Sequence, residues 1–342
     1  MSEKVTQQFP NDKTSEPTIV PRGPDWVTMV IETRCNLHCR MCIYHSRHTK
    51  WPAMRWSLGY DDYVRLTDIL VENGLKHMHL CAVGEPFLNR DIFRMIRYGS
   101  ERGLPCSVLT NASGVVTPHL DEILDSELDY FQTDLDSGDP AQYEHIKDGA
   151  KWDVVVSNLK TLAEGRARRK KPLRLGVWCI VMRSNYTTFG DLVRICADIG
   201  VDDLNYSYLV PVDFCEEMST ANVIDPNDAE IRRAIEASRA RGEKLGVRVV
   251  ALPLSREDRQ ECRCKAPWTK LMINLPSPRL PVQDWLGNAS LHCSLAIYGN
   301  GHTFGNILKQ PFQEVWNGKL IRNIRQGLLS DPPEICLNCP VF

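Results

Sequence analysis

The stretch WVTMVIETRCNLHCRMC, residues 26–42, joins an apolar run to three closely spaced cysteines. Its first eight residues are apolar and rich in β-branched side chains, which predicts a strand. Cys35, Cys39 and Cys42 follow on the segment that leaves this strand. Three thiolates at this spacing can hold three corners of an iron–sulfur cube and leave its fourth iron open. A zinc knuckle or three unrelated thiols are the alternatives.

Strand-like and helix-like segments alternate along the chain after this stretch. The predicted strands cover residues 26–33, 76–83, 105–112, 128–136, 173–182, 202–210 and 247–252, and the predicted helices cover residues 61–74, 90–103, 152–168, 187–200 and 228–242. Six strand–helix units in series predict an α/β fold with a parallel sheet. The pattern leaves an open doubly wound sheet and a full or partial barrel as alternatives. In both, chemistry lies at the carboxyl ends of the strands.

Composition divides the chain into three parts. Residues 1–25 are polar, contain prolines and lack the apolar core of a signal peptide, which predicts a flexible N-terminal tail. Residues 26–252 carry the alternating pattern. Residues 253–342 are rich in Cys, Pro, Gly and Trp and have little periodicity, which predicts a small domain stapled by a metal site.

Charge and cysteine usage restrict the class of protein. The formal net charge of -2 over 342 residues gives no electrostatic case for nucleic acid or membrane as a partner, and no long apolar run predicts a membrane span. The basic run at 166–174 is predicted to be a solvated helix end, with docking of an acidic redox partner as the alternative. Thirteen cysteines without an export signal favour metal binding over disulfides. Cys81, Cys106, Cys179 and Cys196 lie in apolar runs and are predicted to be core residues.

The cysteine triplet after the first strand of such a series resembles the radical S-adenosylmethionine (radical SAM) superfamily. The resemblance implies a partial (β/α)6 barrel similar to the TIM barrel, with a 4Fe–4S cluster on Cys35, Cys39 and Cys42. In that family S-adenosylmethionine (SAM) binds the open iron and is cleaved to a 5′-deoxyadenosyl radical, which abstracts a hydrogen atom from the substrate. The resemblance further implies a cytoplasmic enzyme that receives electrons from flavodoxin or ferredoxin.

Two further motifs strengthen this resemblance. VGEP at residues 83–86 resembles the family's GGEP motif, which implies that Gly84, Glu85 and Pro86 hold the amino group of SAM. LTNAS at residues 109–113 resembles the Thr-Asn-Gly that ends the third strand, which makes Thr110 and Asn111 candidates for cofactor binding. Turn chemistry alone is the alternative for such residues.

Three more candidates for cofactor binding follow from the same comparison. DLDSGDPAQYEHIK, residues 134–147, resembles the segment ending the fourth strand and contributes Asp134, Asp136 and Lys147, the last standing where Arg often pairs with the SAM carboxylate. Lysine lacks the bidentate fork of Arg. MRSN at residues 182–185 resembles a turn near the carboxylate and adenine of SAM and contributes Arg183 and Asn185. Tyr44 is a candidate for stacking on adenine, with core packing as the equal alternative.

The last quarter of the chain resembles SPASM or twitch extensions, which bind auxiliary clusters. In GNILKQPFQEVWNGKLIRNIRQG, residues 305–327, a Trp-ended helix and an Arg-containing helix are expected to lead to a final CxxC. The resemblance implies one auxiliary 4Fe–4S cluster on Cys293, Cys336, Cys339 and one of Cys262 and Cys264, of which we assign Cys264. Zinc is the alternative, because thiolates suit both metals. Cys262 and Cys215 are then candidate catalytic hydrogen-atom donors, with idle thiols as the favoured alternative.

The resemblance predicts a small-molecule substrate, namely a sugar, aminocyclitol or nucleoside intermediate of natural-product biosynthesis that is dehydrogenated, epimerised or decarboxylated. Only about 25 residues precede the first strand, which mildly disfavours the alternative of a ribosomal peptide or protein maturase. A non-catalytic iron–sulfur or zinc scaffold is the third hypothesis. His79, Trp178, Tyr206 and Tyr208 are candidate substrate contacts, although barrel core is the favoured interpretation for each.

Overall fold

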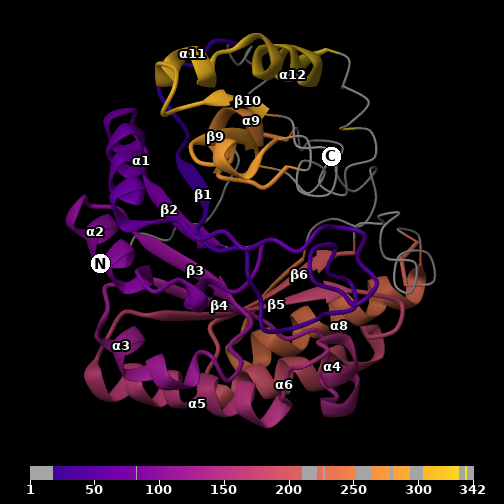
Figure 1. The fold of residues 1–342 in the computed structure, drawn as a ribbon. Coiled ribbons are helices and arrows are strands. Elements are labelled where there is room, and N and C mark those ends of the chain that lie inside the picture. The colour runs from indigo at the N-terminus through magenta and orange to yellow at the C-terminus, as the bar shows by residue number, and fades with distance from the viewer. Residues whose placement is uncertain are drawn as a thin grey trace.

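A computed structural model describes residues 18–81, 83–209, 222–225, 228–251, 264–277, 280–292, 303–330 and residue 336. Within these residues ten strands form one sheet in the order β10-β9-β8-β1-β2-β3-β4-β5-β6-β7 (Figure 1). The strands are β1 (Trp26–Val30), β2 (His77–Cys81), β3 (Cys106–Thr110), β4 (Tyr130–Asp134), β5 (Arg174–Val181), β6 (Asp203–Tyr208), β7 (Arg248–Ala251), β8 (Lys270–Ile273), β9 (Asn288–Leu291) and β10 (Thr303–Asn306).

Strands β1 to β7 run parallel and follow one another in sequence order. An open doubly wound sheet reverses its strand order at a switch point, whereas a barrel does not. The predicted partial barrel is therefore confirmed, and each of these seven strands lies inside its predicted range. β1, β5 and β7 are apolar runs rich in β-branched residues, as expected of parallel strands that are covered on both faces.

Helices cover the outer side of this curved sheet (Figure 1). They are α1 (Tyr60–Glu72), α2 (Ile92–Glu101), α3 (Leu120–Asp125), α4 (Pro140–Ile146), α5 (Trp152–Arg169), α6 (Phe189–Ile199) and α8 (Ala229–Leu245). Their ends follow local sequence signals. For example, the Asp228 side chain accepts hydrogen bonds from the backbone N–H groups of Glu230 and Ile231 at the start of α8, and Gly246 ends it at φ +77°.

The tail of the chain extends the main sheet. β8 pairs in parallel with β1, with Lys270 opposite Trp26, and β9 and β10 add antiparallel strands. The short helices are α9 (Ala266–Thr269), α11 (Phe312–Trp316) and α12 (Lys319–Leu329). The Trp-ended helix and the Arg-containing helix expected from the sequence are α11 and α12. The sheet is continuous across the boundary expected at residues 252 and 253.

Residues 18–25 differ from the flexible tail predicted for residues 1–25. The Asn317 side chain accepts a hydrogen bond from Val20 N and donates one to Val20 O. Trp316 Nε1 donates to Arg22 O at 2.8 Å. The buried Arg325 guanidinium donates to Thr18 O at 3.0 Å. Two elements that are distant in sequence thus hold this segment, which its polar composition could not reveal.

Candidate active site

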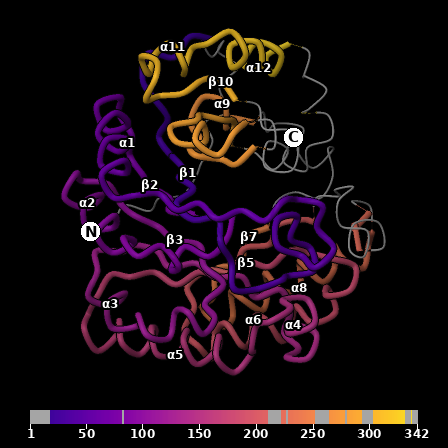
Figure 2. The backbone as a smooth tube through the Cα atoms, viewed as in Figure 1, coloured from indigo at the N-terminus to yellow at the C-terminus, as the bar shows by residue number. Residues whose placement is uncertain are grey.

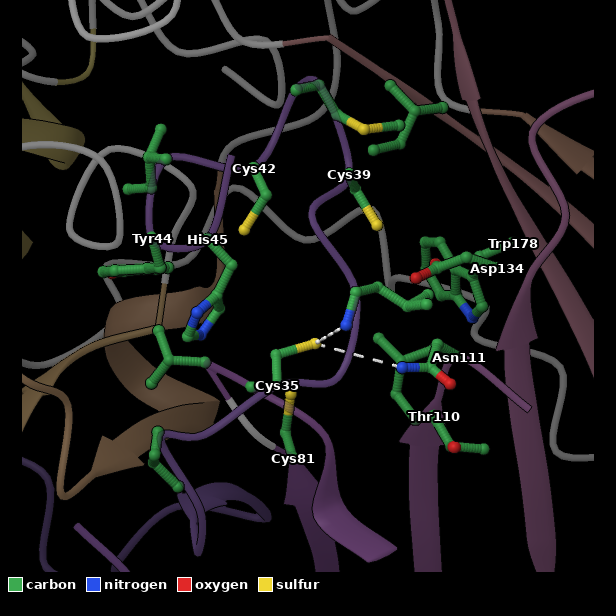
Figure 3. A pocket seen from close by; sticks show the side chains of 18 of the residues that line it. Cys35, Cys39, Cys42, Tyr44, His45, Cys81, Thr110, Asn111, Asp134 and Trp178 are labelled. Atoms are coloured by element: carbon green, nitrogen blue, oxygen red, sulfur yellow. Dashed lines mark hydrogen bonds between the residues drawn. The ribbon is translucent and has the colours of Figure 1, made fainter. Parts of the chain in front are cut away.

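Cys35, Cys39 and Cys42 line one cavity of about 340 Å³ at the carboxyl ends of the barrel strands (Figure 3). Residues from β1 to β6 and their following loops form most of the rest of its wall, and Met272 of β8 and Leu275 complete it. The cavity is therefore where an α/β barrel concentrates its chemistry. Leu37 N donates to Cys35 Sγ at 3.4 Å, and Asn111 Nδ2 lies 4.0 Å from the same sulfur.

The loop that carries these thiols is held at both ends. Thr33 and Trp56 exchange backbone and side-chain hydrogen bonds of 2.7 to 2.9 Å. The backbone N–H groups of His38 and Arg40 donate to Asp148 O and Ile146 O, at 2.8 and 3.0 Å. The loop is thereby fixed against its own base and against the end of α4.

The three thiols fit a sulfide-bridged cluster better than a single ion. Within the described part of the chain, no three His, Cys, Asp or Glu side chains converge as the ligands of one metal ion would. The three thiols instead line one cavity from separate positions (Figure 3), as corner ligands of a larger cluster do. Burial raises the pKa of Cys35 to about 11 and that of Cys39 to about 12, with Lys147 opposing the shift at Cys39. Iron binding must therefore displace protons from these thiols.

Gly84 of the VGEP motif presses against the cysteine loop. A Cβ at this position would lie 1.9 Å from Arg34 O, so only glycine permits the approach. Glu85 N donates to the same oxygen at 2.7 Å. The motif therefore joins the end of β2 to the cysteine loop, and Gly84 lines the cavity.

The Glu85 carboxylate does not line the cavity. It is fully buried and accepts hydrogen bonds from Thr110 Oγ1 at 2.7 Å, Asn111 N at 2.9 Å and Phe87 N at 3.1 Å. Burial raises its pKa to about 7, and the hydrogen bond from Asn111 N opposes this shift. The side chain thus braces β2 against the end of β3. Pro86 is buried and begins the 3₁₀ turn Pro86–Leu88.

Lys147 and two carboxylates form a buried cluster beside Cys39. Lys147 Nζ lies 3.2 Å from Asp134 Oδ2 and 3.0 Å from Asp136 Oδ2. Burial opposes the charge of the lysine, but the two carboxylates outweigh it and hold the pKa of Lys147 well above its ordinary value. Asp134 and Lys147 line the cavity.

Other cofactor-binding candidates divide into two groups. Tyr44, Thr110 and Asn111 line the cavity, and the Tyr44 ring makes an edge contact with Trp51 at 4.9 Å between centroids. Asn185 lies behind the wall, where its Nδ2 donates to Asp136 O at 2.7 Å and to Ile180 O at 2.8 Å. Arg183 points elsewhere and pairs with Asp228 at 3.1 Å.

Two expectations, for Cys81 on β2 and Tyr206 on β6, are wrong about which face of the strand carries the side chain. Cys81 lines the cavity beside Cys35 instead of lying in the core (Figure 3). Tyr206 does not face the barrel: it stacks on Phe189 of α6 at 4.4 Å, and Ser207 faces the cavity. The alternation of His77, His79 and Cys81 is the signal that could have identified Cys81, because alternate strand residues share one face.

The cavity lining and burial place five further residues for which the sequence predicted a substrate contact or a core position. Trp178 lines the cavity and is labelled at its wall in Figure 3. His79 is buried lower in the barrel, where its Nδ1 lies 2.8 Å from Ser107 Oγ. Cys106, Cys179 and Cys196 are buried in the core as predicted.

The residues expected to bind an auxiliary cluster are described only in part. Cys215, Cys262, Cys293 and Cys339 lie outside the described residues. Cys264 and Cys336 are half-buried. Cys336 packs against a hydrophobic cluster that contains Trp268 and Leu291. Cys336 therefore lies beside β9, α12 and α9, and Cys264 is four residues before Trp268 in the sequence.

Two family models match the parts of the chain that form these sites. The model of the radical SAM superfamily matches residues 29–171, and the model of the SPASM iron–sulfur cluster-binding domain matches residues 284–340. The chain therefore carries a radical SAM domain and a C-terminal SPASM domain. The cofactors of the radical SAM domain are SAM and a 4Fe–4S cluster. The SPASM domain binds auxiliary iron–sulfur clusters.

Curated relatives are distant but extend over much of the chain. The pre-heme d1 synthase of Dinoroseobacter shibae is 23% identical over 83% of this chain and 71% of that protein. The AdoMet-dependent heme synthase of Methanosarcina barkeri is 22% identical over 93% of this chain and 88% of that protein. The PqqA peptide cyclase of Bradyrhizobium diazoefficiens is 23% identical over 52% of this chain, which spans only 44% of that protein.

Solved structures share the fold. Streptococcus suis SuiB bound to S-adenosylmethionine superposes with a TM-score of 0.70 at 17% identity, over 94% of this chain and 72% of SuiB. The structure titled native anSMEcpe with bound AdoMet gives a TM-score of 0.61 at 12% identity, over 85% of this chain and 80% of that one. Among the described residues, no helix has the length and apolar character needed to cross a membrane.

Proposed function

We propose that this chain cleaves SAM reductively and uses the resulting radical to oxidise a substrate by two electrons. The observation that carries the proposal is the placement of Cys35, Cys39 and Cys42 in one cavity with the ends of β2 to β4. When bound, the cluster and SAM together supply a 5′-deoxyadenosyl radical for hydrogen-atom abstraction. The protein supplies binding, orientation and exclusion of water.

The cavity wall offers SAM different groups from those expected. Lys147 lies between two carboxylates, so little of its charge remains for the SAM carboxylate. Asp134, whose side chain is 28% exposed, is the more exposed of the two members of this cluster that line the cavity. Its oxygens suit hydrogen-bond donors such as the ribose hydroxyls or the ammonium of SAM. Asn111 supplies a further amide at the same wall.

We further propose one auxiliary 4Fe–4S cluster as the acceptor of the second electron. Its ligands would be Cys264, Cys293, Cys336 and Cys339, and the packing of Cys336 against Trp268, four residues after Cys264, supports this set. Four protein thiolates leave no open iron, which suits electron transfer. A proton lost from the substrate radical would balance the two-electron oxidation.

A small molecule is our first candidate for the substrate. Two relatives that align over more than two-thirds of both chains are named for heme synthesis, and both names describe small-molecule chemistry. Dehydrogenation, epimerisation or decarboxylation of a sugar, aminocyclitol or nucleoside stays a narrower proposal within this class. Peptide maturation is the second candidate, because PqqA peptide cyclase is a relative and SuiB was solved with its precursor peptide.

Anaerobic reconstitution followed by dithionite reduction in the presence of SAM tests the proposal. We expect 5′-deoxyadenosine and methionine in equal amounts, and about eight iron and eight sulfide per chain. A fully loaded protein that forms no 5′-deoxyadenosine would contradict it. Deuterium transfer from a labelled candidate into 5′-deoxyadenosine would then distinguish a small molecule from a peptide.

A further inference from the structure

The loop that carries the three cysteines is strongly basic. Residues 33–60 contain five Lys or Arg and no Asp or Glu, in a chain whose formal net charge is -2. We call this segment the basic loop. Its five cations are Arg34, Arg40, Arg47, Lys50 and Arg55. Four of them are exposed, and Arg40 is half-buried.

Neighbouring acids neutralise only part of this charge. Arg34 pairs with the buried Glu32 at 2.7 Å, and Arg47 pairs with Asp148 at 2.5 Å. Lys50 and Arg55 form no ion pair with any residue that the structure describes. The loop therefore presents positive charge to solvent.

The cations lie close to the thiols along the chain. Arg34 precedes Cys35, and Arg40 follows Cys39. Lys50 and Arg55 flank a segment in which Trp51 and Met54 pack in one hydrophobic cluster with Cys42 and Tyr44. Figure 2 traces the loop as it leaves β1 and folds across the carboxyl end of the barrel. A protein bound to this loop would lie close to the cluster.

The other basic segment of the chain, residues 166–174, is built differently. Arg166 pairs with Asp202, Arg169 pairs with Asp121 and Asp125, and Arg174 pairs with Asp203. The run ends where β5 begins, so it lies at the amino end of the barrel, opposite the cysteines. Internal ion pairs neutralise three of the six cations in this run, and the run lies at the opposite end of the barrel from the cysteines, which supports the solvated helix end over a docking site for an electron donor.

We propose that the basic loop is the docking surface for an acidic protein that donates single electrons to the cluster. This inference rests on the proposed function, because it names the partner of the same site. One electron leaves the donor and enters the cluster, and no bond forms or breaks. Redox partners meet through small, transient interfaces, for which complementary charge raises the association rate more than the affinity.

The test compares a protein donor with a small chemical donor. Reduced flavodoxin, an acidic protein, is mixed with the reconstituted enzyme, and cluster reduction is followed by the loss of visible absorbance. We expect the Lys50→Glu/Arg55→Glu variant to slow this reaction by about tenfold. Dithionite should reduce the variant and the wild type at the same rate. Lys170→Glu/Lys171→Glu, in the other basic run, is the matched control and should react like the wild type.

A second measurement needs no variant. For the wild type, the rate with flavodoxin should fall as salt rises from about 0.05 to 0.5 M, because salt screens exposed charges. A rate that is independent of salt, or a control variant slowed as much as the Lys50→Glu/Arg55→Glu variant, would overturn the docking surface. Failure to form 5′-deoxyadenosine with dithionite would instead contradict the proposed function, because cluster reduction is recorded without SAM.

Discussion

Lys147 Nζ lies 3.0 Å from Asp136 Oδ2, in a pair whose side chains are 5% and 0% exposed. Asp134 Oδ2 lies 3.2 Å from the same nitrogen. Among the described residues, the lysine is therefore the cation paired with both the last carboxylate of β4, Asp134, and the carboxylate two residues further on, Asp136. A buried charge without a partner is costly, so this cluster links the stability of the barrel to the site.

We expect Lys147→Met to lower the free energy of unfolding by about 3–5 kcal/mol, because it leaves two carboxylates without their cation. Urea denaturation of the cluster-free chain measures the change. Lys151→Met removes an exposed lysine paired with Glu144 and should cost less than about 1 kcal/mol. Lys147→Met/Asp136→Asn should recover part of the loss. Equal stability of the two single variants would refute the role given to Lys147.

Replacing one thiol of the triplet should remove one cluster. Cys35→Ala, Cys39→Ala or Cys42→Ala is expected to lower the iron content by about four per chain and to abolish 5′-deoxyadenosine formation. Cys196→Ala, in the core on α6, is the control and should keep both. Unchanged iron content in the triplet variants would exclude this site, whatever the activity.

Replacing a thiol of the auxiliary site should remove iron without abolishing SAM cleavage. Cys264→Ala or Cys336→Ala should also lose about four iron per chain, yet reductive cleavage of SAM should persist. Formation of oxidised substrate should fall, because the second electron has no acceptor. Iron and sulfide analysis, with assay of 5′-deoxyadenosine in the absence of substrate, checks both parts. A wild-type protein that contains about four iron and one zinc per chain would show that the metal site of residues 253–342 is only structural.

Buried histidines predict how stability depends on pH. Burial lowers the pKa of His79 to about 3, with His292, His77 and Lys270 adding to the shift. Below its unfolded pKa of about 6.5, the unfolded chain binds a proton that the folded chain rejects, so stability falls as the pH drops. Between pH 6.5 and 5 the loss from His79 is about 2 kcal/mol.

Urea denaturation at pH 7 and pH 5 measures this loss. His79→Asn keeps a polar side chain near Ser107 and cannot be protonated, so its stability should change less between the two pH values. The difference from the wild type should be about 2 kcal/mol. Identical pH dependence in both proteins would show that other groups cause the acid sensitivity.

Sequence reasoning predicted most of the barrel and only part of the site. Apolar runs bounded by Gly, Asn and Pro identified β1 to β7, because such signals act over short distances. The spacing of Cys35, Cys39 and Cys42 identified the cluster loop for the same reason. Glu85 was expected to face the cofactor, yet its carboxylate points to Thr110 and Asn111, because β2 and β3 are in contact there.

The sequence by itself determined which segments form strands and helices and which thiols lie together on one loop. Tertiary structure alone decided that β8 pairs with β1, that Cys81 and Ser207 face the cavity while Tyr206 packs on α6, and that Arg325 binds the backbone of Thr18. The reason is physical. Secondary structure follows from neighbours within a few residues, whereas the inward phase of a strand and the partner of a buried charge depend on residues that only folding brings together.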